Sequence, residues 1–234
     1  MSKKYKGKTC VYCTVNKSTC PDHVIAREFF PVKQRADLPK APSCDACNSS
    51  KSELEHYATT VLLFASQHAD AQDMLKKLAP KRLNKNLKLK RELKNKSERI
   101  WVKTSSELIV PSMIVPIKGD SLKQLFSMII RGLYWHNWET ILPADYKVEI
   151  LTINFQGLLE FRENILLDTT NVIQHNLGDG VFHYRYIKAD DDPGISAWEM
   201  YFYNGINIVG QGNQAVFFCG LTGPEDIWHD VSMN

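Results

Sequence analysis

The pattern of apolar and polar positions predicts two long helices in this chain. From residue 48 to residue 79, apolar residues recur every three or four positions, which places them on one stripe of a helix. Pro80 follows and is expected to end this helix, because proline lacks the amide hydrogen that the next turn requires. A second stripe begins after Gly119-Asp120 and predicts a helix that continues to Tyr134. The first stripe comprises Leu54, Tyr57, Ala58, Val61, Leu62, Ala65 and Ala69.

Strand signals are concentrated in the second half of the chain, where β-branched and aromatic residues cluster. Residues 108–110 and 113–115 predict two short strands interrupted by Pro111. Asn204-Gly205 is typical of a tight hairpin. We therefore expect residues 100–234 to form a separate α+β domain with a mainly antiparallel sheet. Its further strands are predicted at 147–155, 181–188, 197–203, 206–209 and 214–219.

The composition is that of a globular protein. Of the 234 residues, 44% are hydrophobic and 24% are charged. No apolar run approaches the roughly 20 residues that cross a membrane. The basic start of the chain lacks the apolar stretch of a secretory signal. We therefore expect a cytoplasmic protein with no membrane partner, whose cysteines are metal ligands or free thiols rather than disulfides.

Four of the six cysteines form two pairs with the spacing of a zinc site. Two residues separate Cys10 from Cys13, and two separate Cys44 from Cys47. Such pairs complete a tetrahedral set of thiolates, which is typical of structural Zn²⁺ and leaves no open position for chemistry. Cys20 has no partner in this pattern. A free thiol is its default interpretation, and an alternative zinc ligand is the second.

The charge is divided unevenly along the chain. Residues 1–118 hold 23 of the 29 Lys and Arg but 11 of the 26 Asp and Glu, so the remainder of the chain is acidic. The basic half indicates a polyanionic partner. Within it, nine of the nineteen residues of segment 81–99 are Lys or Arg. This segment is either a solvated connector or an arm that lies along a phosphate backbone through Lys81, Arg82, Lys85, Lys88 and Arg91.

Asp22-His23 lies between the two cysteine pairs, and Asn48 follows the second pair directly. Neighbouring residues of an extended segment point in opposite directions, so Asp22 and His23 are expected to have different roles. Carboxylate and amide oxygens suit Mg²⁺ or Mn²⁺, with water and phosphate as the other ligands. A neutral imidazole beside them is able to accept a proton from water near neutral pH.

Cys-x2-Cys, Asp-His-Val-Ile and Cys-x2-Cys-Asn-x2-Lys, in this order, resemble the HNH endonucleases, the ββα-metal or His-Me finger group. The resemblance covers roughly residues 8–60. It implies a zinc-stapled ββα-metal module at 1–60, followed by a long helix and basic connector at 61–99. The resemblance implies no role for the domain at 100–234.

The resemblance also implies roles for single residues. His23 would activate water, and Asp22 and Asn48 would hold one divalent ion, Mg²⁺ or Mn²⁺. Lys51 matches the family's lysine, which would reach a phosphate or be solvated, and His56 is a further candidate ligand. Residues 24–43 contain no Asn, which many members use to support the catalytic His. Gln34 or a backbone carbonyl would then orient His23.

The sequence therefore predicts a metal-dependent endonuclease that hydrolyses phosphodiester bonds, with DNA favoured and RNA left open. The alternative is a non-catalytic zinc module that binds nucleic acid and needs neither Asp22, His23 nor Asn48 for chemistry. In both interpretations the acidic second domain is expected to bind a protein partner or to mediate self-association.

Overall fold

The computed structural model describes residues 4–64, 66, 68–103, 107–166, 171–207 and 215–225, and it has the α+β class that the sequence predicts. The N-terminal module begins with the antiparallel strands β1 (Cys20–His23) and β2 (Lys40–Ser43). Two 3-10 helices, Arg27–Phe29 and Val32–Gln34, lie in the connection between them. Helix α1 (Asp45–Phe64) follows at once, so the order is ββα.

The single helix predicted from residue 48 to residue 79 is wrong. Helix α1 ends at Phe64, and α2 (Ala69–Lys77), α3 (Ala79–Lys85) and α4 (Leu87–Lys96) follow. The chain turns between α1 and α2, where the His68 side chain accepts a hydrogen bond from the amide of Asp70 and caps α2. A helix does end just before Pro80, since α2 ends at Lys77, and Pro80 itself lies in the first turn of α3, where no amide hydrogen is needed.

Strands β3 (Glu98–Lys103) and β4 (Ile109–Ile114) form a two-stranded antiparallel ribbon. The sequence predicts two short strands on either side of Pro111, whereas β4 continues through this proline. A proline is tolerated there because each strand of the ribbon pairs with one neighbour only, so the missing amide need not serve a second ladder.

Helix α5 (Gly119–Trp138) confirms the second predicted helix and precedes the main sheet. Five strands pair antiparallel in the order β5-β10-β8-β7-β6, and β9 pairs with β10. The bounds of these strands are β5 Tyr146–Ile153, β6 Ile173–Leu177, β7 Phe182–Lys188, β8 Ser196–Phe202, β9 Ile206–Asn207 and β10 Ala215–Pro224.

The sequence misses α6 (Phe155–Asn164) and β6. The strand predicted to run to Phe155 ends at Ile153, because the side chain of Asn154 accepts a hydrogen bond from the amide of Gly157 and begins α6. The predicted turn is present but the hairpin is wrong: Asn204 and Gly205 lie between β8 and β9 with φ of 60° and 105°, whereas β9 pairs with β10 and not with β8. The predicted strand residues 208, 209 and 214 lie outside the described residues.

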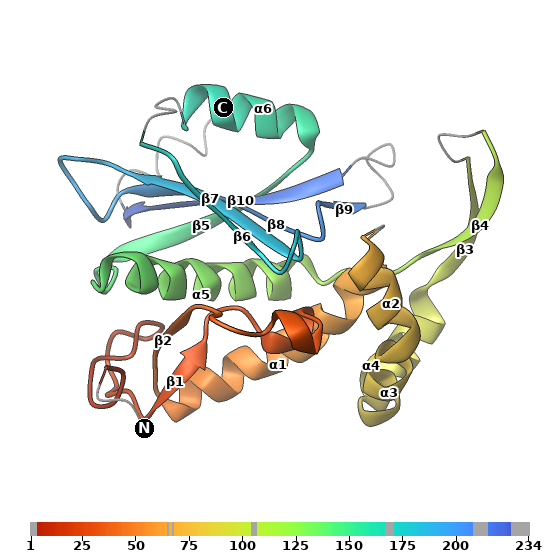
Figure 1. Cartoon of the computed structure of the whole chain (residues 1–234), viewed down its shortest axis with the longest axis horizontal. Coiled ribbons are helices and arrows are strands. Elements are labelled where there is room, and N and C mark those ends of the chain that lie inside the picture. The colour runs from red at the N-terminus through yellow and green to blue at the C-terminus, as the bar shows by residue number, and fades with distance from the viewer. Residues whose placement is uncertain are drawn as a thin grey trace.

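The elements stack in layers (Figure 1). Helix α6 covers one face of the sheet and α5 covers the other, and the N-terminal module packs on the opposite side of α5. A continuous cluster of buried apolar side chains extends from Val24 and Phe29 in the module, through α5, to Trp198 and Phe202 in the sheet. The division of the chain at residues 60 and 99 stays a prediction, and this cluster contains residues from all three parts.

Among the described residues, none of the helices combines the length and the apolar character needed to span a bilayer.

Candidate metal centre and adjacent catalytic residues

The four paired cysteines meet at one point. Cys10 and Cys13 lie in the turn before β1, and Cys44 and Cys47 lie where β2 passes into α1. Their sulfur atoms all lie within 4.8 Å of one another, and Cys13 Sγ is 4.0 Å from Cys44 Sγ. Tetrahedral zinc with Zn–S bonds of about 2.3 Å needs sulfur atoms about 3.8 Å apart. The donor set therefore fits a structural zinc ion.

The protonation of these thiols depends on their surroundings. Burial opposes ionisation of Cys13, but hydrogen bonds from the backbone amides of Asn16 and Val15 outweigh it and lower the pKa to about 7. Burial and a hydrogen bond with Cys44 raise the pKa of Cys47. Four adjacent thiols cannot all ionise without a cation, so a bound metal would supply the compensating charge.

Cys20 lies outside this cluster. Its thiol is free of any disulfide and donates to the carbonyl of Ser43 at 3.7 Å. Among the described residues it belongs to no group of potential metal ligands, which favours the free-thiol interpretation.

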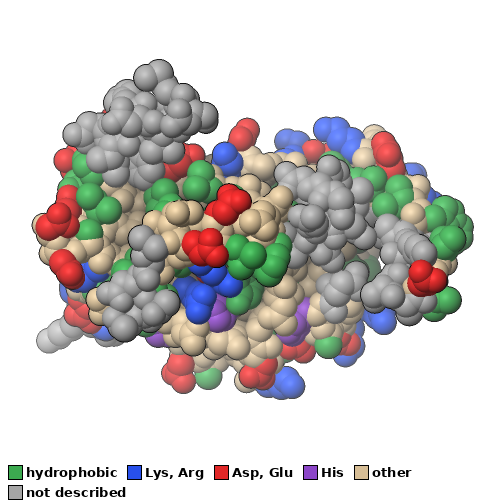
Figure 2. Space-filling model, turned by 90° about the horizontal axis from the view of Figure 1, so that it is seen from above, with side chains coloured by type: hydrophobic (Ala, Val, Ile, Leu, Met, Phe, Trp, Pro, Cys, Tyr) green, Lys and Arg blue, Asp and Glu red, His purple; other side chains and the backbone are tan. Residues whose placement is uncertain are grey.

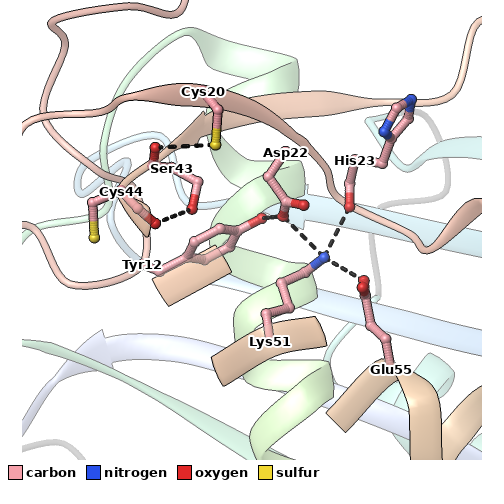
Figure 3. A network of polar contacts seen from close by, with 8 residues as sticks. All are labelled: Tyr12, Cys20, Asp22, His23, Ser43, Cys44, Lys51 and Glu55. Atoms are coloured by element: carbon pink, nitrogen blue, oxygen red, sulfur yellow. Dashed lines mark hydrogen bonds and ion pairs between the residues drawn. The ribbon is translucent and has the colours of Figure 1, made fainter. Parts of the chain in front are cut away.

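Asp22 is buried at the centre of a polar network beside the cysteines (Figure 3). The Tyr12 hydroxyl donates to Asp22 Oδ2 at 2.5 Å, and Lys51 Nζ lies 2.9 Å from the same oxygen. Lys51 also pairs with Glu55, one turn along α1, and donates to the carbonyl of His23 at 2.8 Å. The network therefore holds strand β1 against helix α1.

Lys51 is not the solvated or phosphate-binding residue that the resemblance implies. Its side chain is 0% exposed. Alternation on β1 turns Asp22 inward, and the buried carboxylate of Asp22 and the half-buried carboxylate of Glu55 require a cation in the same place. Burial raises the pKa of Glu55 to about 7, and the charge of Lys51 only partly offsets this rise.

His23 faces away from that network. Its carbonyl points toward Lys51, while its imidazole points to the other side of β1 (Figure 3). The ring is half-buried. Burial lowers its pKa, and the nearby charges of Lys40 and Arg27 lower it further. The neutral imidazole that a general base requires is therefore favoured at pH 7.

Gln34 does not orient His23. Its amide nitrogen lies 3.3 Å from carboxylate oxygens of both Asp70 and Asp179, so the side chain ties the loop after β1 to α2 and to the turn before β7. The spacing along the sequence gave no sign of these distant partners.

Asn48 and His56 lie two turns apart on α1. Asn48 is half-buried in the first turn, and its backbone amide donates to the backbone carbonyl of Cys44. His56 is exposed and lines a cavity of about 170 Å³. The cavity is also lined by Glu28, Ser52, Glu55 and Thr59.

Among the described Cys, His, Asp and Glu side chains, only the four cysteines form a group that could share an ion. A catalytic ion at Asp22 and Asn48 would therefore need water and phosphate to complete its shell.

Most of the predicted nucleic-acid residues lie on the surface of α3 and α4. Lys81, Lys85, Lys88 and Arg91 are exposed. Arg82 is an exception, since it is partly buried and donates to the carbonyls of Thr59 and Glu28. Burial lowers the pKa of Arg82. This residue anchors α3 to the wall of the cavity and does not present its charge to solvent as predicted.

Sequence reasoning misses Tyr12 and Glu55. Glu55 stands four residues after Lys51, a spacing that allows an ion pair on a helix and was a usable signal. Tyr12 lies between the two cysteines of the first pair, and nothing in its spacing indicates a contact with Asp22.

Comparison with protein-family models, with curated proteins and with solved structures finds no match for this chain.

Proposed function

We propose that this protein is a divalent-metal-dependent endonuclease that hydrolyses phosphodiester bonds in nucleic acid, with DNA the favoured substrate. The observation that carries the proposal is the ββα unit: β1, β2 and α1 bring Asp22, His23 and Asn48 next to a four-cysteine cluster. The ββα order supports the proposal, and so does the half-buried imidazole of His23, whose pKa burial lowers.

In this mechanism His23 accepts a proton from a water molecule while the water oxygen forms a bond to phosphorus. The bond from phosphorus to the 3′ oxygen breaks, and that oxygen leaves with the electron pair. Asp22 and Asn48 would hold Mg²⁺ or Mn²⁺, which supplies positive charge for the leaving oxygen and the transition state. Tyr12 and Lys51 fix the orientation of the Asp22 carboxylate through Oδ2.

The exposed cations of α3 and α4 supply the surface for a polyanion. Arg82 joins α3 to Glu28 and Thr59, two residues of the cavity wall. The basic helices therefore begin beside the face of α1 that carries Ser52 and His56. A nucleic acid that follows these helices would lie along the module, because phosphate contacts position the strand without reading its sequence.

One observation favours a second function, a non-catalytic zinc module that binds nucleic acid. Asp22 already has a structural role, since Lys51 and Tyr12 both contact it in the buried network. Asp22 would therefore be needed for folding even if no catalytic ion ever bound. This alternative needs the same zinc ion and the same basic helices, and it differs in needing no catalytic ion at Asp22 and Asn48 and no general base at His23.

A cleavage assay of the full chain separates the two functions. Wild type and His23→Ala are incubated with Mg²⁺ or Mn²⁺ and with single-stranded and duplex DNA and RNA. Loss of the general base is expected to lower cleavage about 10²- to 10⁴-fold, with zinc content and binding unchanged. His136→Ala removes an exposed imidazole from α5, outside the module, and is expected to keep most of the activity. Zinc-loaded wild type that binds but never cuts would favour the second function.

A further inference from the structure

The β3–β4 ribbon exposes large apolar side chains that the proposed chemistry does not use. It extends from the end of α4 at the side of the molecule (Figure 1). Trp101 is 72% exposed, and Ile109 and Leu108 are 68% and 64% exposed. A surface tryptophan next to two exposed aliphatic residues marks an interaction surface more often than an incidental feature.

Basic residues lie beside this apolar surface, together with the exposed Glu98 and Glu107. Arg99 stands two positions before Trp101 on β3, so strand alternation places both on one face of the ribbon. Both residues are exposed. The ribbon directly follows α4, where Arg91, Lys94 and Lys96 are also exposed. The same end of the molecule is at the right of Figure 2, where hydrophobic, basic and acidic side chains lie close together on the surface.

The combination of exposed cations and an exposed aromatic ring selects among partners. The ribbon of a second copy would offer the cations of α4 no opposite charge, because residues 98–114 hold two acidic and two basic residues and are neutral overall. A polyanion does complement these cations. Single-stranded nucleic acid in particular is bound by cations that follow the backbone and by aromatic rings on which unpaired bases stack. A regular duplex would have to be unstacked before a tryptophan could contact a base face.

We infer that the β3–β4 ribbon is a binding site for unpaired nucleotides, with Trp101 stacking on a base and Arg99 contacting the adjacent phosphate. The basic helices α3 and α4 continue this path toward the cavity on α1. The inference rests on the proposed function in that it names the substrate class of the nuclease: a nucleic acid with a single-stranded segment next to the bond that is cut.

Binding without metal tests the ribbon separately from cleavage. Full-length His23→Ala protein, with and without Trp101→Ala, is titrated into a fluorescently labelled single-stranded oligonucleotide and into its duplex, with polarisation as the readout. Loss of stacking is expected to weaken single-strand binding about tenfold and to change duplex binding much less. Trp101→Phe should restore most of the affinity, because it keeps a stacking ring. Phe155→Ala, which removes another exposed aromatic residue from α6, is the matched control and should change neither affinity.

Charge is tested in the same assay. Arg99→Ala should reduce the dependence of log K on log salt by about 0.7, whereas Trp101→Ala should leave that slope unchanged. Equal losses for single strand and duplex, or no loss with Trp101→Ala, would overturn the inference. So would a wild-type dimer that Trp101→Ala converts to monomers with unchanged binding. A ribbon that binds as expected in a protein that never cuts would contradict the proposed nuclease and leave the binding site standing.

Discussion

The N-terminal module and the main sheet are stabilised in different ways. In the module, four cysteines converge on one point and a fully buried lysine neutralises two carboxylates. In the sheet, aromatic rings fill the interior, as where Phe126 of α5 stacks on Phe218 of β10 with ring centroids 3.9 Å apart. The module is too small to bury much apolar surface by itself, so a metal and charged contacts contribute what packing cannot.

Helix α5 joins the two regions by packing tightly on both. A Cβ at Gly132 would lie 2.7 Å from Val24, which follows β1 in the module. A Cβ at Gly220 of β10 would overlap with the side chain of Ile130 on α5. The comparison teaches that Asp22 and His23 are held from two directions, by the four-cysteine cluster on one side and by α5 on the other.

Removing the zinc ligands is expected to have the largest effect. Binding of structural zinc contributes about 10–16 kcal/mol in isolated zinc modules, so Cys44→Ser should unfold much of residues 4–64. Zinc content per chain and protease sensitivity of the module check this expectation, while the near-UV signal of the sheet aromatics reports on the other region. Cys20→Ser, outside the cluster, is the matched control. A metal-free Cys44→Ser protein with full helicity would contradict the assigned role.

Replacing the buried lysine should come next in magnitude. Lys51→Met leaves the buried carboxylate of Asp22 and the half-buried carboxylate of Glu55 without a cation, which is expected to cost about 3–5 kcal/mol in the free energy of unfolding. Urea denaturation measures this cost. Lys77→Met removes an exposed pair with Asp73 and should change stability by about 1 kcal/mol or less. Equal effects of the two changes would show that the Lys51 network does not hold the module together.

Adding a methyl group at the two glycines where α5 packs closely on its neighbours should have the smallest effects on stability. Gly132→Ala and Gly220→Ala are each expected to lower the free energy of unfolding by about 1–3 kcal/mol through overpacking. The higher helix propensity of alanine reduces the cost at Gly132 by about 1 kcal/mol. Gly119→Ala is the control, because its Cβ would meet nothing within 4 Å. Thermal unfolding of the three variants ranks them, and a Gly220→Ala protein as stable as Gly119→Ala would disprove the close packing of α5 on the sheet.

Local patterns account for the elements that were predicted correctly. The stripe after Gly119 gave α5, and the spacing of Asn204-Gly205 gave the turn between β8 and β9. Predictions from local patterns were wrong where the structure depends on a residue outside the pattern or where the pattern is weak. The break after α1 depends on the cap at His68, and the short β6 has no strong strand signal because only Ile173 and Leu177 of its five residues are aliphatic.

The sequence by itself determined the α+β class and the four-cysteine cluster, because cysteine spacing and apolar periodicity are local properties that survive in any compatible fold. Only the tertiary structure decided the roles of Lys51, Gln34 and Arg82. Lys51 pairs with the carboxylate of Asp22, Gln34 contacts distant aspartates, and Arg82 donates to backbone carbonyls. A long polar side chain has no fixed partner until distant segments pack together. Burial then favours the arrangement in which the buried charges find partners, because an unpaired buried charge is costly.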